Sequence, residues 1–313
     1  MVNGVINIYK EQNYTSQDVV AILRKKLGIK KIGHTGTLDP MAQGVLPLCI
    51  NKATRIMDYL DYDLKVYRCI CKLGLETDTL DIWGNILEEK KIPTLSKEDV
   101  IKAFQIGFIE QIPPKFSALK FNGKKLYEYA RAGIELPDDI KKRKTYIKSM
   151  DLLSFDGENI EFRVVCSKGT YVRSICHDLG VRLGTCGTMS YLEREASGVF
   201  TQDDAISIEK IKDMDINELL SHIKVTEYPL DKLGKIVVPM DHTGSKFITG
   251  MHIPPAECIS ITPGQFDEEI PKLHDHLLDE KFCVFNENGS FLGVAYYSHQ
   301  YHKYVADKVF YEE

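Results

Sequence analysis

Residues 33–47 read Gly33-His34-Thr35-Gly36-Thr37-Leu38-Asp39-Pro40-Met41-Ala42-Gln43-Gly44-Val45-Leu46-Pro47 and place one carboxylate, that of Asp39, between glycines. Three glycines and two prolines make this segment easy to bend and costly to order. Such a loop is either a plain turn or a scaffold for a reactive group. On local physics alone, Asp39-Pro40 is typical of a helix N-cap followed by proline, although Gly44 and Pro47 would end that helix almost at once.

The length and composition of the chain predict a globular protein with a full hydrophobic core. It has 313 residues, 43% of them apolar, which fits one large domain with a smaller companion. No stretch approaches the roughly twenty apolar residues that a membrane-spanning helix needs, and Met1-Val2-Asn3-Gly4 lacks the pattern of a signal peptide. We therefore expect a cytoplasmic protein that does not bind membranes.

The cysteines and histidines lack the spacing of a metal site. None of the eight cysteines belongs to a Cys-x-x-Cys pair, which argues against a zinc ribbon. Cys69 and Cys71 alternate with their neighbours as small buried residues of a strand do. No cysteine near His274 and His276 completes a ligand set, so we interpret this pair as part of a solvated loop. The sequence also contains no dinucleotide-binding fingerprint and no P-loop.

Basic residues are concentrated in two segments although the net charge is −5. Residues 111–150 contain ten lysines or arginines against four acids, and residues 21–36 contain five with no acid. Each segment alone is most simply a solvated surface. Together, and with the second leading directly into the Asp39 loop, they favour a polyanionic substrate.

Periodicity predicts strands and helices around the loop. Residues 5–9 are typical of a strand, and a helix follows that Ser16 caps and Gly28 ends. Residues 67–73 alternate like a strand, with Tyr67 on the apolar face. From this pattern alone, Tyr67 is most simply interpreted as an aromatic residue of the core. Glycines, a proline and many charges in residues 115–150 predict an excursion with short helices outside the central sheet.

A further helix is expected from about Gly169 to Gly184. Arg173 lies in its first turn and off its apolar stripe, so spacing alone favours a solvent-exposed arginine over an ion pair with a buried anion. Beyond Tyr228 the pattern changes to short strands and turns, with a hairpin-like turn at Asn286–Gly289, which predicts a small β-rich appendix.

Five ordered blocks of sequence carry a resemblance to a known family. They are the Gly33–Pro47 segment; Lys65-Val66-Tyr67-Arg68; Gln111-Ile112-Pro113-Pro114-Lys115-Phe116-Ser117-Ala118-Leu119-Lys120; Gly123 with Tyr127, Ala130 and Arg131; and Cys166-Ser167-Lys168-Gly169-Thr170-Tyr171-Val172-Arg173-Ser174. In this order they resemble the TruB family of bacterial tRNA pseudouridine synthases. The resemblance covers residues 4–197 strongly, whereas residues 282–310 are only similar to the family's PUA-like RNA-binding domain.

The resemblance implies a role for individual residues. Asp39 corresponds to the catalytic nucleophile, Tyr67 to the residue that stacks on the target base, and Arg173 to the partner of the Asp39 carboxylate. The implied substrate-binding residues are His34, Tyr67, Tyr171, Leu192 and Lys10. The chain departs from the family at Lys10-Glu11-Gln12-Asn13, where Lys-Pro-x-Gly is usual, and at Glu193, where the family has an arginine. These departures put the local loop shape and one RNA contact in doubt.

The resemblance also implies the fold and the activity. We expect an α/β (α+β) pseudouridine-synthase fold, with a mixed, mainly antiparallel sheet flanked by helices in residues 1–228 and a PUA-like domain in residues 229–313. The implied reaction isomerises uridine 55 in the T loop of tRNA, by base flipping and without cofactor or metal. We expect a monomer that binds the T-stem-loop of tRNA and needs no protein partner. A non-catalytic RNA-binding or RNA-folding protein, and a guide-dependent subunit that modifies ribosomal RNA, stay open as alternatives.

Overall fold

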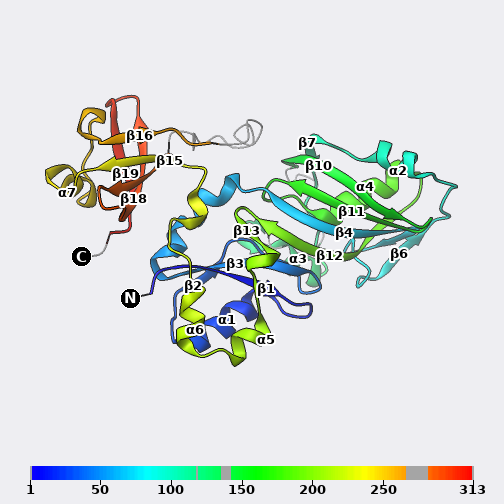
Figure 1. The fold of residues 1–313 in the computed structure, drawn as a ribbon. Coiled ribbons are helices and arrows are strands. Elements are labelled where there is room, and N and C mark those ends of the chain that lie inside the picture. Colours follow the sequence, from blue (N-terminus) through cyan, green and yellow to red (C-terminus); the bar gives the residue numbers. More distant parts are fainter. Residues whose placement is uncertain (1, 118, 135–141, 266–280, 312–313) are drawn as a thin grey trace.

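Two sheets of unequal size organise the molecule, one of ten strands and one of five (Figure 1). The computed structural model describes residues 2–117, 119–134, 142–265 and 281–311. His274 and His276, interpreted above as part of a solvated loop, lie outside the described residues. Within the described part of the chain, no helix is both long and apolar enough to span a bilayer.

The large sheet is mixed and mainly antiparallel, as predicted. Its strands are β1 (Gly4–Lys10), β2 (Ile32–His34), β3 (Gln43–Ile50), β4 (Lys65–Leu73), β7 (Gly107–Gln111), β10 (Arg143–Phe155), β11 (Asn159–Cys166), β12 (Gly187–Ser197), β13 (Phe200–Thr201) and β14 (Ile206–Ser207). The order is β14-β1-β3-β12-β4-β11-β10-β7, with β2 beside β3 and β13 beside β12. Only β1–β14 and β3–β12 pair in parallel among these strands.

Helices and two small hairpins surround this sheet. They are α1 (Ser16–Leu27), η1 (Asn51–Tyr62), α2 (Lys97–Ala103), α3 (Leu126–Arg131), α4 (Val172–Arg182), η2 (Gln202–Asp204), α5 (Ile208–Asp213), α6 (Ile216–Ser221), and the strand pairs β5 (Leu75–Thr77) with β6 (Ile86–Glu89) and β8 (Lys120–Phe121) with β9 (Lys124–Lys125). Helix α4 packs across β4 and β12. The alternation predicted for residues 67–73 is confirmed, because Tyr67, Cys69 and Cys71 are buried while residues between them are more exposed.

The cap predicted for α1 is shifted by one residue. Thr15 is the N-cap and exchanges hydrogen bonds with Asp18 in a capping box, while Gly28 ends the helix in the predicted left-handed conformation at φ +66°. Ser16 is instead the first helical residue and is buried. Its hydroxyl is therefore free to bind another segment.

The prediction that residues 115–150 lie outside the central sheet is wrong for their last part. Residues 143–150 belong to β10, which pairs with β7 on one side and β11 on the other. Thr145 and Ile147 are buried on one face of this strand, while its lysines and arginines lie on exposed positions or at its end. The charges that suggested an excursion are therefore compatible with a half-buried strand. The short helix expected in this segment is present as α3.

The predicted β-rich appendix is the second sheet, in the order β16-β15-β17-β18-β19 (Figure 1). Its elements are η3 (Tyr228–Leu230), β15 (Gly234–Val238), α7 (His242–Ile248), η4 (Pro255–Glu257), β16 (Ser260–Thr262), β17 (Lys281–Asn286), β18 (Phe291–Ser298) and β19 (Lys303–Val309). It contacts η1, since the Tyr59 hydroxyl donates to Asp307 Oδ2 (2.9 Å) and Arg55 donates to the carbonyl of Val309 (2.9 Å). A domain boundary between residues 228 and 229 stays our proposal.

Candidate active site

The loop that carries Asp39 connects β2 to β3, and its backbone is held from several sides. The Ser16 hydroxyl donates to the carbonyl of Leu38 (3.1 Å) and accepts from its amide (2.9 Å). The Pro40 carbonyl accepts from Lys10 Nζ (3.2 Å) and from the amide of Asn13 (2.8 Å). The backbone on both sides of Asp39 is therefore fixed, which positions its carboxylate.

The interpretation of Asp39-Pro40 as the start of a helix is wrong. The amide of Ala42 donates to the carbonyl of Asp39 (3.1 Å), which closes a single turn, and β3 begins at Gln43. Gly44 then has φ +112°, and a Cβ there would lie 2.2 Å from the carbonyl oxygen of Arg194. Only glycine allows β3 to approach β12 so closely in this conformation. The loop is thus a scaffold and not a capped helix.

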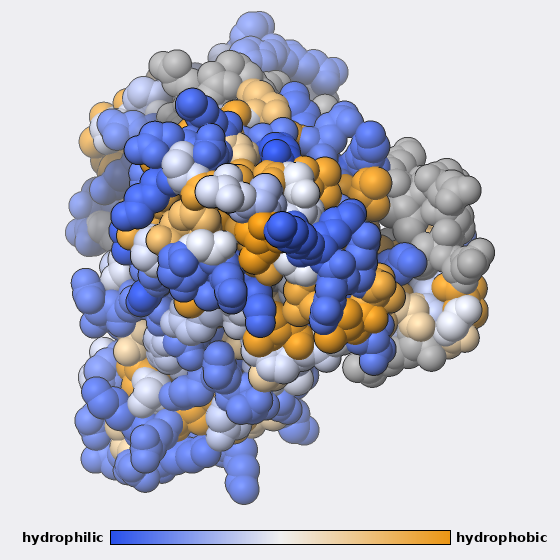
Figure 2. All heavy atoms as spheres, turned by 90° about the vertical axis from the view of Figure 1, so that its right-hand side faces the viewer, coloured by the Kyte–Doolittle hydropathy of each residue, from blue (hydrophilic) through white to orange (hydrophobic). Residues whose placement is uncertain are grey.

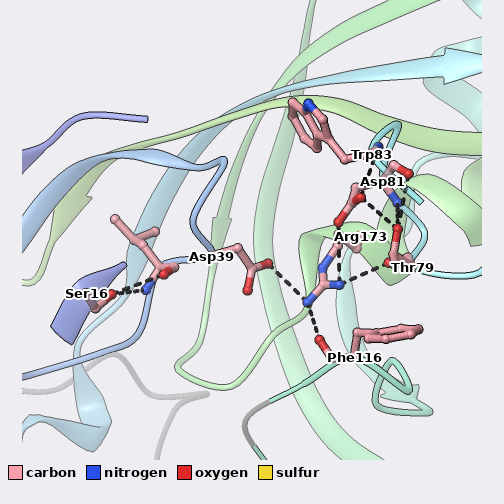
Figure 3. Close-up of polar contacts among 8 residues, drawn as sticks. Ser16, Asp39, Thr79, Asp81, Trp83, Phe116 and Arg173 are labelled. Carbon is pink, nitrogen blue, oxygen red and sulfur yellow. Dashed lines mark hydrogen bonds and ion pairs between the residues drawn. The ribbon is translucent and has the colours of Figure 1, made fainter. Parts of the chain in front are cut away.

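The carboxylate of Asp39 forms an ion pair with the guanidinium of Arg173, at 3.1 Å between Oδ2 and Nη2 (Figure 3). The exposed fractions of the two side chains differ, 38% for Asp39 and 6% for Arg173. Arg173 is therefore not the solvent-exposed residue that helical spacing favoured. It lies at the start of α4, and segments from elsewhere in the chain cover it.

These covering segments bind the remaining edges of the guanidinium. Nη1 donates to the carbonyl of Thr79 (3.0 Å), and Nη2 donates to that of Phe116 (3.0 Å). A second carboxylate, that of Asp81, has Oδ2 3.7 Å from Nη1. Arg173 is thus a buried cation between two carboxylates and two carbonyls, which fixes its plane toward Asp39.

The Asp39–Arg173 pair opens into a cavity of about 590 Å³. It is lined by His34, Thr35, Gly36, Thr37, Leu38, Asp39, Lys65, Tyr67, Ser117, Leu119, Arg143, Lys168, Gly169, Thr170, Tyr171, Val172, Arg173, Leu192 and Arg194. All the residues for which a site role was expected therefore meet here except Lys10. Lys10 is fully buried, and its Nζ donates to the carbonyls of Glu11, Tyr14 and Pro40, so it braces the loop from behind.

The charge of the cavity is strongly positive. Among the described residues, its charged lining consists of one carboxylate, that of Asp39, and five cations, at positions 65, 143, 168, 173 and 194. Lys65 is buried on the same strand face as Tyr67, and burial lowers the pKa of its ammonium to about 8. Its Nζ donates to the Ser197 hydroxyl (2.8 Å). Such a field suits an anionic ligand whose phosphates remain near the cations.

Two uncharged polar side chains line the same cavity as the carboxylate. Burial raises the pKa of the Tyr67 phenol, while the nearby Arg194 guanidinium acts in the opposite direction. Burial, and then Arg194, lowers the pKa of His34, so its imidazole is neutral at pH 7. The buried Nδ1 of His34 has no protein partner among the described residues.

Sequence reasoning missed three parts of this site. Arg194 is 1% exposed and donates to the carbonyls of Val45 (2.7 Å) and Gly36 (3.1 Å), which joins β12 to the loop. Asp81 lies in the turn between β5 and β6, where no site residue was predicted from the sequence. Lys65 lies two residues before the predicted alternation of residues 67–73 and on the same face of β4 as Tyr67. A lysine in phase with an apolar face was the signal that could have identified it.

Comparison with known proteins places the chain in a family. Residues 24–172 match the model of the TruB family pseudouridylate synthase N-terminal domain, and residues 173–243 match that of the tRNA pseudouridylate synthase B C-terminal domain. A protein named tRNA pseudouridine synthase B from Clostridium perfringens (strain 13 / Type A) is 42% identical over 297 residues, 94% of each chain. One of the same name from Clostridium tetani is 46% identical over 220 residues, 70% of this chain and 75% of that protein.

A solved structure has the same fold at low sequence identity. It is described as an H/ACA RNP bound to a substrate RNA containing 2′-deoxyuridine; the TM-score is 0.71 at 22% identity, with 99% of this chain and 85% of the other covered. Fold, cavity and family models together define the class, a pseudouridylate synthase. The chain belongs to the TruB family of these enzymes.

Proposed function

We propose that this chain isomerises uridine 55 in the T loop of tRNA to pseudouridine, with Asp39 as the nucleophile. The observation that carries the proposal is a partly exposed carboxylate, paired with a buried guanidinium at 3.1 Å, at the wall of a cationic cavity. The relatives named tRNA pseudouridine synthase B support tRNA as the substrate.

The reaction needs a carboxylate and no external reagent. The C1′–N1 bond of the uridine breaks, the uracil turns, and C5 bonds to C1′; C5 loses its proton and N1 gains one, so product and substrate are isomers and no donor is needed. Asp39 serves whether the first step is attack on C6, attack on C1′ or removal of the C2′ proton, since each requires a carboxylate at one place. Arg173 stabilises the charged form of this carboxylate as water leaves the cavity.

The target base must leave its stack to reach Asp39, which costs roughly a few kcal/mol. Stacking on Tyr67 returns about 1–3 kcal/mol, which is of the same order. The Tyr67 hydroxyl is also a candidate proton relay, because its raised pKa keeps it protonated at neutral pH. Further contacts to the nucleotide are assigned to His34, Tyr171 and Leu192, which line the cavity.

The partner is the T-stem-loop of tRNA, bound by a monomer in the cytoplasm. The basic residues of positions 115–150 clamp the RNA backbone, and the second sheet is a PUA-like RNA-binding domain. Both alternatives are less favoured. A non-catalytic RNA-binding protein does not require Asp39, Tyr67 and Arg173 around one cavity, and the basic residues fit an enzyme that captures its target without a guide RNA.

Tritium release from tRNA labelled at C5 of uridine tests the proposal. The wild type is expected to release tritium from full-length tRNA and from a bare T-stem-loop transcript. Asp39→Asn is expected to bind the transcript without release, whereas Asp213→Asn, at an exposed position that does not line the cavity, retains activity. Binding without release by the wild type would support the non-catalytic alternative, and release only in the presence of added guide RNA would support the guided one.

A further inference from the structure

Four side chains with metal-binding atoms meet at the base of the β5–β6 hairpin. Glu76 lies on β5, Glu88 on β6 and Cys186 directly before β12, and one ligand atom from each lies within 4.8 Å of the other two. His177 of α4 adds a ring nitrogen, because its Nε2 is 3.7 Å from Oε1 of Glu76. None of the four lines the cavity that contains Asp39.

The position of the Cys186 thiol is not explained by packing alone. The residue is 2% exposed, and its Sγ lies 3.8 Å from a carboxylate oxygen of Glu76 and 3.8 Å from one of Glu88. A thiol has one proton and can donate it to only one of these carboxylates. In a tetrahedral zinc site with Zn–S of about 2.3 Å and Zn–O of about 2.1 Å, the sulfur and oxygen ligands stand about 3.6 Å apart. The observed separations are close to this value.

Charge and orientation favour a cation at the same point. Two carboxylates share the space, and the cation beside them is Lys90, whose Nζ is 3.1 Å from Glu88 and whose side chain is half exposed. The Nδ1 of His177 is 3.2 Å from Oδ1 of Asp178. Metal-binding histidines usually donate one ring N–H to a carboxylate in this way, which leaves the other nitrogen for the metal.

We propose that Glu76, Glu88, Cys186 and His177 form a structural binding site for Zn²⁺. Thiolate and imidazole donors favour zinc, whereas magnesium and calcium take oxygen ligands. The His177 side chain is 33% exposed, and its Nε2 supplies the fourth donor. Ions enter from the surface, because the Glu88 side chain is 48% exposed. Strand β6, which carries Glu88, lies on the right-hand side of the molecule in Figure 1, the side that faces the viewer in Figure 2.

The site would join both strands of the hairpin to α4 and to the start of β12. The hairpin turn, residues 78–85, contains Thr79 and Asp81, which contact Arg173. A metal at the hairpin base therefore restricts the turn that holds the guanidinium. This role is structural and does not depend on the reaction proposed above.

Metal analysis of the full-length protein tests the site. After purification from zinc-supplemented medium and dialysis against metal-free buffer, elemental analysis of the wild type is expected to find one zinc per chain. Glu88→Gln, a conservative change at a half-exposed side chain, and Cys186→Ala are expected to bind zinc at least about 100-fold more weakly. Asp178→Asn, which removes only the carboxylate that orients His177, is expected to weaken binding about 10-fold.

Two controls separate this site from other donors. Cys258→Ala removes a cysteine between η4 and β16, and His274→Ala with His276→Ala removes the His-x-His pair; both variants are expected to keep zinc. A wild type without zinc, zinc retained by Glu88→Gln, or zinc absent from the His274/His276 variant would each overturn the proposal. In a second readout, zinc should slow amide exchange in residues 78–85 of the wild type and not of Glu88→Gln; equal exchange in both would also contradict the site.

Discussion

Asp39 and Asp81 contact the same guanidinium from two different turns, and their surroundings separate their roles. The Asp39 side chain is 38% exposed at 3.1 Å from Arg173, whereas that of Asp81 is 14% exposed at 3.7 Å. Asp81 Oδ1 also accepts from the Thr79 hydroxyl (2.7 Å) and the amide of Trp83 (3.2 Å), which ties it to its own turn (Figure 3). One carboxylate is left accessible to a substrate while the other holds the arginine, so proximity to a buried cation alone does not identify a nucleophile.

The largest difference in turnover is expected between the variants Asp39→Asn and Asp81→Asn. Asp39→Asn should lower turnover by at least about 1,000-fold, because it removes the carboxylate that we propose as the nucleophile. Asp81→Asn should lower it by only about 10-fold, through a less restrained Arg173. Single-turnover tritium release measures both. Equal reductions would show that the two carboxylates act as one unit and would contradict the separation of roles.

Arg173→Lys tests the cation that the two carboxylates share. Lysine keeps the charge but cannot bind Asp39, Asp81 and two carbonyls in one plane, so turnover should fall about 100-fold. The affinity for the T-stem-loop should stay near that of the wild type, as a filter-binding titration with Asp213→Asn as control would measure. Turnover near the wild-type rate would rule out this role of the guanidinium.

Substitutions of Tyr67 test which property of the ring is used beside Asp39. Tyr67→Leu removes stacking worth about 1–3 kcal/mol and should cost about 10- to 100-fold in turnover. Tyr67→Phe keeps stacking and removes only the hydroxyl. Any reduction in its turnover therefore measures the contribution of the hydroxyl as a proton relay. Equal reductions in the two variants would mean that stacking is not the important property of Tyr67.

The smallest effect is expected on four consecutive basic residues at positions 141–144, of which Arg143 also lines the cavity that contains Asp39. Neutralising Lys141, which lies outside the described residues, together with Lys142, Arg143 and Lys144 should flatten the slope of log affinity against log salt. The expected change is about 1 for each phosphate that these side chains no longer neutralise. A salt titration of T-stem-loop binding measures the slope. An unchanged slope would return these residues to an ordinary solvated surface.

Local sequence patterns were sufficient where neighbours along the chain decide the structure. The alternation of residues 67–73, the left-handed Gly28 and the second β-rich region are all present as predicted. Local patterns gave wrong predictions where contacts with a segment distant in the sequence decide the structure. Ser16 binds Leu38 instead of capping its own helix, and residues 143–150 join the sheet because β7 and β11 cover their edges.

Asp39 was identified as the candidate reactive group by the resemblance of its motif to that of the TruB family, because local patterning alone favoured a helix N-cap at Asp39-Pro40. The partner it faces was fixed by packing, since the segments that bury Arg173, at Thr79 and Phe116, lie far from α4 in the sequence. The same holds for Glu76, Glu88, His177 and Cys186, whose spacing along the chain shows no ligand pattern. Local sequence patterns determine the conformation of neighbouring residues. Contacts between side chains that are distant in the sequence form only when the sheet brings their segments together.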